Sequence, residues 1–233
     1  MTSPRAVFAL EDAQLVAELF DVPSLARLRG LVDLDEHVVT RAEPRAPRAA
    51  ARTEILITGW GAPRLDALAL DDWPHLRAVF HAAGTVKRVV SPDLWERGIR
   101  VSSSAAANAM PVAEYTLSMI LLSAKQALAS ADAFRRTQNM AAARPHGRFG
   151  AYGITVGIVG ASRIGRRVLE LLRPFDISAV LYDPSLSTTD AAALGATLVS
   201  LDDLLRASDI VSLHAPSLPE TRRMIGAAEL ATM

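Results

Sequence analysis

The chain has 233 residues, half of them hydrophobic and about a fifth charged, a composition that excludes an intrinsically disordered protein. Its 25 basic and 25 acidic residues give a formal net charge of zero, which argues against a nucleic-acid partner. The absence of cysteine excludes a disulfide scaffold, a cysteine nucleophile and cysteine-ligated metal centres. The length favours two modest domains, or one domain and part of another.

Neither a signal peptide nor a membrane span is expected. The apolar stretch 5–10 is too short for the core of a signal peptide, and it is followed by Glu11 and Asp12. Every apolar run falls short of the roughly 18 residues that a transmembrane helix needs. We therefore expect a cytoplasmic protein without a membrane partner.

The first half of the chain alternates short apolar runs with segments of helical character. The expected strands cover residues 6–10, 36–40, 54–59, 76–81 and 99–102, with helical patterns such as 24–31 and 92–97 between them. This alternation predicts an α/β fold, with parallel strands joined by helical crossovers.

A long helix is expected from Pro111 to about Arg136, because proline suits the first helical turn. Apolar residues surround nearly the whole of its first half, which predicts burial between two partners. Those partners are either two domains of one chain or two subunits. The glycine- and proline-containing stretch 139–152 then predicts a domain linker.

The next segment carries a dinucleotide-binding pattern. A predicted strand, 154–160, leads into Gly160-Ala161-Ser162-Arg163-Ile164-Gly165 and a helix over 166–173, so the GxGxxG pattern has Ser162 as its middle residue. A second strand, 178–182, ends at Asp183, about 20 residues beyond the glycines, as in NAD-binding Rossmann folds. The alternative is an ordinary strand, turn and helix that binds no ligand.

Each part of this pattern has a mechanical role. Gly160 permits the tight turn, Gly165 permits close packing of the helix on the strand, and the start of the helix attracts the pyrophosphate. Ser162 is a small replacement whose hydroxyl can itself contact phosphate. Asp183 would accept hydrogen bonds from the adenosine ribose and repel a 2′-phosphate, which favours NAD over NADP.

Two further expected strands, 196–200 and 209–214, flank a helix over 201–207. In the strand order 3-2-1-4 the strand 209–214 lies beside the first strand of this domain. His214, Ala215 and Pro216 would then face the nicotinamide half of the cofactor. The alternative for His214 is a structural loop histidine.

Five segments together resemble the D-isomer-specific 2-hydroxyacid dehydrogenases. They are SDIVSLHAPSLPETRRMI (208–225), TVGIVGASRIGRRV (155–168), LYD (181–183), LRAVFHAAGTV (76–86) and ANAMPVAEYTLSMILLSAK (107–125). The resemblance implies a flavodoxin-like substrate domain over 1–108, an interdomain helix and linker over 109–152, and a Rossmann NAD-binding domain over 153–233. It places the active site in the cleft between the domains.

The resemblance also implies a set of site residues. Backbone N–H groups of Ala83, Gly84 and Thr85 would bind the substrate carboxylate, and Asn108 would place a polar side chain near substrate or nicotinamide. The residues implied for the cofactor are Gly160, Ser162, Arg163, Ile164, Gly165, Asp183, His214, Ala215, Pro216 and Thr221. The chain departs from the family at Lys87-Arg88-Val89-Val90, where an Asp-Asn-Ile-Asp stretch is usual, so the identity of the acid stays open.

The family's catalytic arginine, glutamate and histidine follow the fourth Rossmann strand, whereas this sequence ends at Met233. None of the three is expected in the chain, and His75, His81 and His146 have no nearby acidic partner to replace them. We therefore expect a truncated Rossmann domain, inactive by itself, that binds NAD weakly. The strand 209–214 would become an exposed edge that promotes aggregation.

The function implied for the full-length parent is hydride transfer between NAD and a small 2-hydroxy or 2-oxo acid, in a homodimer formed through the Pro111–Arg136 region. The alternative is an NAD-sensing regulatory protein, like the family's transcriptional corepressors.

Overall fold

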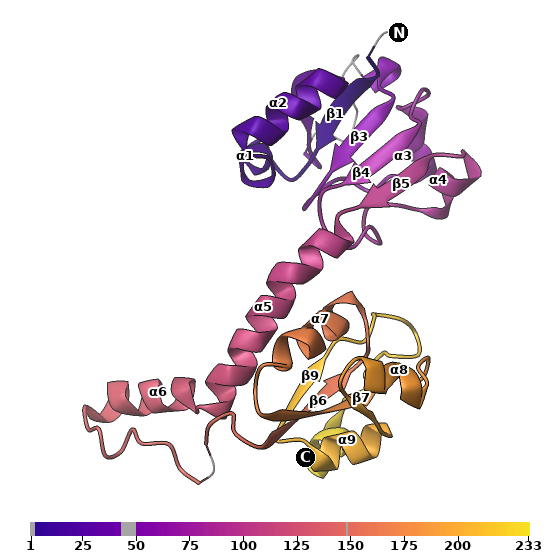
Figure 1. Cartoon of the computed structure of the whole chain (residues 1–233). Coiled ribbons are helices and arrows are strands. Elements are labelled where there is room, and N and C mark those ends of the chain that lie inside the picture. Colours follow the sequence, from indigo (N-terminus) through magenta and orange to yellow (C-terminus); the bar gives the residue numbers. More distant parts are fainter. Residues whose placement is uncertain (1–2, 43–49, 148) are drawn as a thin grey trace. The chain divides into compact units, whose positions relative to one another are not determined.

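The structure is a computed structural model that describes residues 3–42, 50–147 and 149–233. The chain divides into two compact units, Met1–Asn108 and Ala109–Met233, and Figure 1 labels the elements of each. Helix α5 (Ala105–Ala124) begins in the first unit and continues in the second. Across these described ranges, the helices are all too short or too polar to span a bilayer.

The first unit is built on a five-stranded parallel sheet with the order β2-β1-β3-β4-β5, which is the flavodoxin-like order and agrees with the domain that the family resemblance implies. Helices α1 and α2 pack on one face, around Phe8 and Ile57, and α3 and α4 pack on the other, around Leu56 and Val79 (Figure 1). The elements are β1 (Arg5–Ala9), α1 (Leu15–Leu19), α2 (Val22–Leu31), β2 (Asp33–Val39), η1 (Ala50–Arg52), β3 (Ile55–Thr58), α3 (Ala67–Asp71), β4 (Ala78–His81), α4 (Pro92–Glu96) and β5 (Arg100–Ser103).

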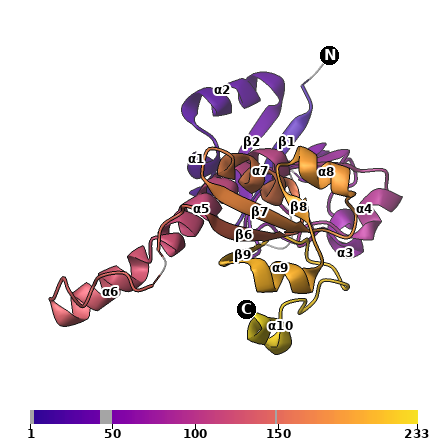
Figure 2. The same cartoon turned by 60° about the horizontal axis from the view of Figure 1, so that its bottom comes forward.

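The second unit contains a four-stranded parallel sheet with the order β8-β7-β6-β9, which confirms the expected 3-2-1-4 arrangement. Figure 2 shows α7 and α8 over one face of this sheet and α9 over the other. The elements are β6 (Ile154–Val159), α7 (Arg163–Leu172), β7 (Ile177–Tyr182), α8 (Thr188–Ala193), β8 (Thr197–Leu198), α9 (Leu201–Ala207), β9 (Ile210–Leu213) and α10 (Ala227–Thr232). The α/β fold with a Rossmann-type domain is thus confirmed.

The prediction of one helix from Pro111 to Arg136 was wrong in two respects: the helix begins earlier, and the segment forms two helices instead of one. Helix α5 begins six residues earlier, at Ala105, and carries Pro111 in its interior. Alanine-rich residues 105–109 have the strongest helix propensity, and they extend the helix back past the proline. Gln126 then adopts a left-handed conformation (φ 52°), which ends the helical path before α6 (Ala127–Thr137) begins.

Residues 138–153, between α6 and β6, form turns and bends, with residue 148 of the predicted linker outside the described residues. The strand predicted over 196–200 is shorter than expected, because β8 has only the two residues Thr197 and Leu198. The chain must leave the sheet there because Ser200 caps α9, accepting a hydrogen bond from the backbone N–H of Asp203 at 3.1 Å.

Candidate functional site

The loop between β6 and α7 is only three residues long, and Gly160 is its first residue. Gly160 has a φ of +96°, a conformation that residues with a side chain rarely adopt. A Cβ atom on Gly160 would also lie 2.6 Å from the backbone nitrogen of Ala215. Glycine is therefore needed both for the turn and for the close approach of the segment that follows β9.

Gly165, in the first turn of α7, is buried against the same loop. A Cβ atom at this position would overlap the carbonyl oxygen of Gly160. The absence of a side chain thus lets the start of α7 lie directly on the end of β6, as expected from the sequence pattern.

Ser162 is the N-cap residue of α7, and its hydroxyl oxygen accepts a hydrogen bond from the N–H of Gly165 at 3.3 Å. Its φ of −62° suits any residue, so the loop conformation does not require glycine here. The N–H groups of Arg163 and Ile164 have no acceptor among the described residues. These two donors, at the positive end of a ten-residue helix, can bind an anion such as a pyrophosphate.

Asp183 directly follows β7, and both of its carboxylate oxygens accept hydrogen bonds. Oδ2 accepts from the backbone N–H of Ala161 at 2.8 Å, and Oδ1 accepts from the N–H and hydroxyl of Ser185 at 2.9 and 2.6 Å. Partial burial raises the pKa of Asp183, but the hydrogen bonds from Ser185 and Ala161 and the charge of Arg166 outweigh it, so the pKa is lowered. Asp183 is therefore a carboxylate at neutral pH.

Arg166, which the sequence analysis did not single out, lies at the same place. Its Nε donates a hydrogen bond to the carbonyl oxygen of Ala161 at 2.9 Å, so side chains hold the Ala161 backbone on both sides. The sequence offers one weak signal, a basic residue directly after the last glycine of the pattern, and such residues are common on helix surfaces.

The segment after β9 passes beside the glycine-rich loop. The backbone N–H of His214 donates to the carbonyl of Val159 at 2.7 Å, and its Nε2 lies 2.8 Å from the hydroxyl of Ser212. Burial lowers the pKa of His214, so its imidazole is neutral at pH 7. Ala215 and Pro216 follow, and Ala215 is the residue that a side chain at position 160 would strike.

Thr221 closes this loop. Its hydroxyl oxygen accepts from the N–H of Leu218 at 3.0 Å and donates to the carbonyl of Pro216 at 2.5 Å. The Thr221 hydroxyl therefore holds the loop by bonding to two of its backbone groups.

In the first unit, the structure brings the predicted substrate residues together. Ala83 is buried, Gly84 and Thr85 follow it, and a Cβ atom on Gly84 would lie 2.9 Å from Nδ2 of Asn108. The amide side chain of Asn108 therefore lies against Gly84. Thr85 is exposed, and its hydroxyl accepts from the N–H of Lys87 at 3.4 Å.

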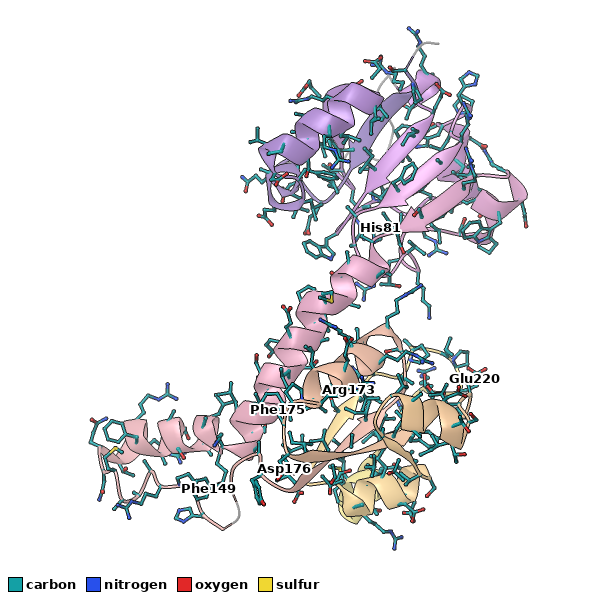
Figure 3. All side chains as sticks on the ribbon, in the orientation of Figure 1. His81, Phe149, Arg173, Phe175, Asp176 and Glu220 are labelled. Carbon is teal, nitrogen blue, oxygen red and sulfur yellow. The ribbon has the colours of Figure 1, made fainter. Side chains whose placement is uncertain are left out.

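His81 lies beneath this loop, at the end of β4, where Figure 3 labels it. It is 4% exposed, its Nδ1 is 2.9 Å from the hydroxyl of Thr58, and its ring also bonds to the backbone of Thr85. Burial lowers the pKa of His81 more than the bond to Thr85 raises it, so the ring is neutral at pH 7. The contacts assign His81 to holding the loop rather than to proton transfer.

Comparison with known proteins agrees with this geometry. Residues 117–233 match the family described as D-isomer specific 2-hydroxyacid dehydrogenase, NAD binding domain. The chain is 35% identical over 170 residues to a D-3-phosphoglycerate dehydrogenase of Mycobacterium tuberculosis, a match that covers 73% of this chain and 32% of that enzyme. It is 34% identical over 176 residues to a glyoxylate reductase of Aeropyrum pernix, with 73% of this chain and 52% of that enzyme covered.

Solved structures share the fold. A D-lactate dehydrogenase from Aquifex aeolicus, solved with NAD and lactic acid, matches with a TM-score of 0.74 and 24% identity, over 98% of this chain and 66% of that one. A D-mandelate dehydrogenase from Rhodotorula graminis matches with a TM-score of 0.76 and 22% identity, over 99% and 71% of the two chains.

The matches to the two curated enzymes thus span about a third and about half of their lengths. The match over residues 117–233 includes the glycine-rich loop, Asp183 and the segment after β9. The cofactor of this domain is NAD, and the cradle formed by Gly160, Gly165 and the start of α7 fits a dinucleotide. The chain belongs to the D-isomer-specific 2-hydroxyacid dehydrogenase family.

Proposed function

We propose that this protein, in its full length, transfers hydride between NAD and a small 2-hydroxy or 2-oxo acid in the cytoplasm. The observation that carries the proposal is the glycine-rich loop joined to Asp183 within a domain of this family. When bound, the nicotinamide supplies the redox chemistry. The metabolic dehydrogenases among its relatives support the cytoplasmic location.

For the cofactor, we assign the pyrophosphate to Gly160, Ser162 and Gly165 and to the free N–H groups of Arg163 and Ile164. We assign the adenosine ribose to Asp183, whose carboxylate would accept hydrogen bonds from the ribose hydroxyls. We assign the nicotinamide half of the cofactor to the segment after β9. His214, Ala215 and Pro216 would lie beside it, and Thr221 would hold the loop. The lowered pKa of His214 supports a neutral neighbour for the nicotinamide, which carries a positive charge when oxidised.

For the substrate, we assign the carboxylate to the backbone N–H groups of Ala83, Gly84 and Thr85. Asn108, whose amide lies against Gly84, would orient the rest of the acid by hydrogen bonding. The exposed cations Lys87 and Arg88 follow the loop directly, and they favour an anionic substrate. These groups would bind and orient the substrate acid. In this proposal, residues other than those described above carry out the proton transfer.

We further propose that the 233-residue chain binds cofactor but does not turn substrate over. In support, the buried histidine beside the proposed substrate loop, His81, bonds to Thr58 and Thr85, and it has no carboxylate partner among the residues that the structure describes. A panel of small 2-oxo acids, including glyoxylate and pyruvate, with NADH would test both statements on this chain and on the protein expressed from its complete gene. Absence of NADH oxidation by the full-length protein with every acid would contradict the proposed activity, and oxidation by the chain alone would contradict its inactivity.

A homodimer through the Pro111–Arg136 region is the proposed assembly. Apolar side chains on α5 and α6, namely Tyr115, Leu128 and Phe134, are exposed in the single chain. Sedimentation of the Leu128→Asp/Phe134→Asp variant should then show monomers where the unmodified chain shows dimers. Leu68→Asp is the matched control, because Leu68 is 81% exposed on α3, outside this region. A monomeric unmodified chain, or no effect of the double substitution, would contradict this assembly.

A further inference from the structure

The loops that follow β3 and β4 are joined to each other at the carboxyl edge of the first sheet, where the two strands lie side by side (Figure 1). After β4, the carbonyl of Val86 accepts hydrogen bonds from the N–H groups three and four residues later, both at 2.9 Å, and this closes a turn. Leu65, at the end of the other loop, donates its N–H to the carbonyl of Val89 at 2.7 Å and accepts from the hydroxyl of Ser91 at 2.8 Å. The backbones of the two loops are therefore fixed against each other.

Three cations lie at this junction. Leu65 and Val89 are buried, with 2% and 4% exposure, whereas the residues directly before them, Arg64 and Arg88, are exposed. Because Leu65 and Val89 are hydrogen-bonded, the two arginines project from neighbouring points of the backbone. Lys87 adds a third positive charge in the same turn. We call Arg64, Lys87 and Arg88 the basic cluster.

The two arginines of the basic cluster are not neutralised by acidic side chains. Across the part of the chain that the structure describes, Arg64 and Arg88 form no ion pair at 4.0 Å or less. The nearest acidic residues along the two loops, Asp66 and Asp93, instead accept hydrogen bonds from a backbone N–H at 3.1 Å and from the hydroxyl of Ser91 at 2.6 Å. Both guanidinium groups therefore keep their donors for water or for a ligand.

The basic cluster lies next to the backbone N–H groups that we assign to the substrate carboxylate. Thr85 is the last residue of that loop, and its hydroxyl accepts from the N–H of Lys87 at 3.4 Å. Arg88 follows Thr85 by three residues, which limits the distance between their Cα atoms to about 11 Å. The charge is also the reverse of the family pattern, in which two aspartates are usual at this turn. One small ligand can therefore contact both the loop and the cluster.

We propose that the basic cluster binds a second anionic group, a carboxylate or a phosphate, at the far end of the substrate acid. The preferred substrates are then 2-oxo or 2-hydroxy acids that carry two anionic groups. The inference rests on the proposed function, since it takes the first carboxylate to bind at Ala83, Gly84 and Thr85. A guanidinium suits this task because its planar set of N–H donors pairs with two oxygens of one anion. The backbone of the cluster is already ordered through Leu65, so binding needs to order only side chains.

Steady-state kinetics of the full-length protein with NADH test this preference on pairs of acids with matched shapes. 2-Oxoglutarate carries a second carboxylate, and 5-methyl-2-oxohexanoate has an uncharged end of nearly the same shape. Phosphonopyruvate and 4,4-dimethyl-2-oxopentanoate form the corresponding pair for a phosphate-like group. The charged acid should have a kcat/KM about tenfold higher than its uncharged counterpart in at least one pair, and that pair identifies the anionic group. Equal values within both pairs would overturn the proposal.

Substitutions then assign the preference to the basic cluster. The ratio of kcat/KM between charged and uncharged acid should fall several-fold in Arg88→Gln and in Arg64→Gln, and most of it should be lost in the double variant. Arg88→Lys should keep part of the ratio, because the charge remains. Arg27→Gln is the matched control, since Arg27 is an exposed arginine of α2, outside the cluster, and it should keep the full ratio. A ratio that survives in the double variant, or that falls equally in Arg27→Gln, would overturn the proposal.

A binding experiment on the 233-residue chain separates this inference from the proposed function. In the presence of NADH, the charged acid of a pair should raise the unfolding temperature more than the uncharged acid at equal millimolar concentration, and the double variant should lose the difference. If the full-length protein oxidises NADH with none of the acids, the proposed function fails, while this difference would still support an anion site at the basic cluster. Turnover without a charge preference would leave the proposed function standing and overturn the inference. The absence of a charge-dependent rise in the unmodified chain would also count against it.

Discussion

The backbone N–H of Ala161 and the carboxylate of Asp183 are joined by a 2.8 Å hydrogen bond, which ties the loop after β6 to the end of the neighbouring strand β7. The two residues thus meet at the carboxyl edge of the sheet, where parallel strands present their loops. One side chain therefore serves two purposes in our proposal, because it fixes the glycine-rich loop and faces the cofactor ribose.

Asp183→Ala should weaken NADH binding by the loss of one or two charge-assisted hydrogen bonds, about 1.5–3 kcal/mol each. NADPH should not suffer this loss, because the carboxylate repels its 2′-phosphate. Fluorescence titration of both cofactors into the unmodified chain and the variant measures the two effects. Equal weakening of NADH and NADPH would show that Asp183 is not the ribose partner.

Ser162 provides a second test, because its φ of −62° does not depend on glycine. Ser162→Gly should tighten NADH binding several-fold by removing the Cβ atom from the path of the pyrophosphate, at a cost of only a few tenths of a kcal/mol in stability. Ser162→Ala keeps the Cβ atom and loses the cap on Gly165, so it should cost about 1 kcal/mol and bring no gain in affinity. NADH titration and thermal unfolding are the measurements. Weaker binding by Ser162→Gly would instead indicate that the serine hydroxyl contacts the phosphate.

Gly165→Ala should destabilise the chain by more than 1 kcal/mol, because the new methyl group overlaps the backbone oxygen of Gly160 and cannot be relieved by a side-chain movement. The matched control is Gly30→Ala in α2, where a Cβ atom meets nothing within 4 Å and the backbone φ is not positive. That change should stabilise the chain by roughly 0.5–1 kcal/mol. Chemical denaturation of the three proteins gives the free energies. A tolerated alanine at position 165 would contradict the close packing of α7 on β6.

Stability should fall on mild acidification. The pKa values of His81 and His214 are lowered from 6.5 by burial, so between the lowered value and 6.5 the unfolded chain takes up protons that the folded chain does not. The contribution of the two histidines to the free energy of unfolding therefore has its full value above about pH 6.5. It decreases as the pH falls toward the lowered pKa, by up to about 1.4 kcal/mol per pH unit for each histidine. Urea denaturation from pH 5 to 8 should show this slope, and it should be shallower in His81→Gln. An unchanged slope in His81→Gln would contradict a buried neutral His81.

Most of the fold follows from local signals in the sequence. Each short apolar run forms a strand, and Gly160 and Gly165 perform the expected tasks, because backbone conformation and Cβ contacts depend on neighbouring residues. The start of α5 could not be placed in this way, since the proline signal at Pro111 competes with the propensity of the preceding alanines.

The partner of His81 depends on tertiary structure, and that of Arg166 depends on the exact geometry of a turn, so the sequence pattern indicated neither. Thr58 lies 23 residues from His81, and the two side chains meet only because the parallel register of β3 and β4 pairs these positions. Likewise, Arg166 reaches Ala161 only once the first turn of α7 has formed.

The double anchoring of Ala161, by Asp183 on its N–H and by Arg166 on its carbonyl, has a kinetic and thermodynamic consequence. Ordering a backbone segment costs about 1–2 kcal/mol per residue in conformational entropy, and here that ordering accompanies folding rather than cofactor binding. The cofactor should therefore associate in a single phase whose rate rises linearly with NADH concentration, without the saturating slow step that loop rearrangement would add. We therefore expect the loop to have the same conformation before and after the dinucleotide binds.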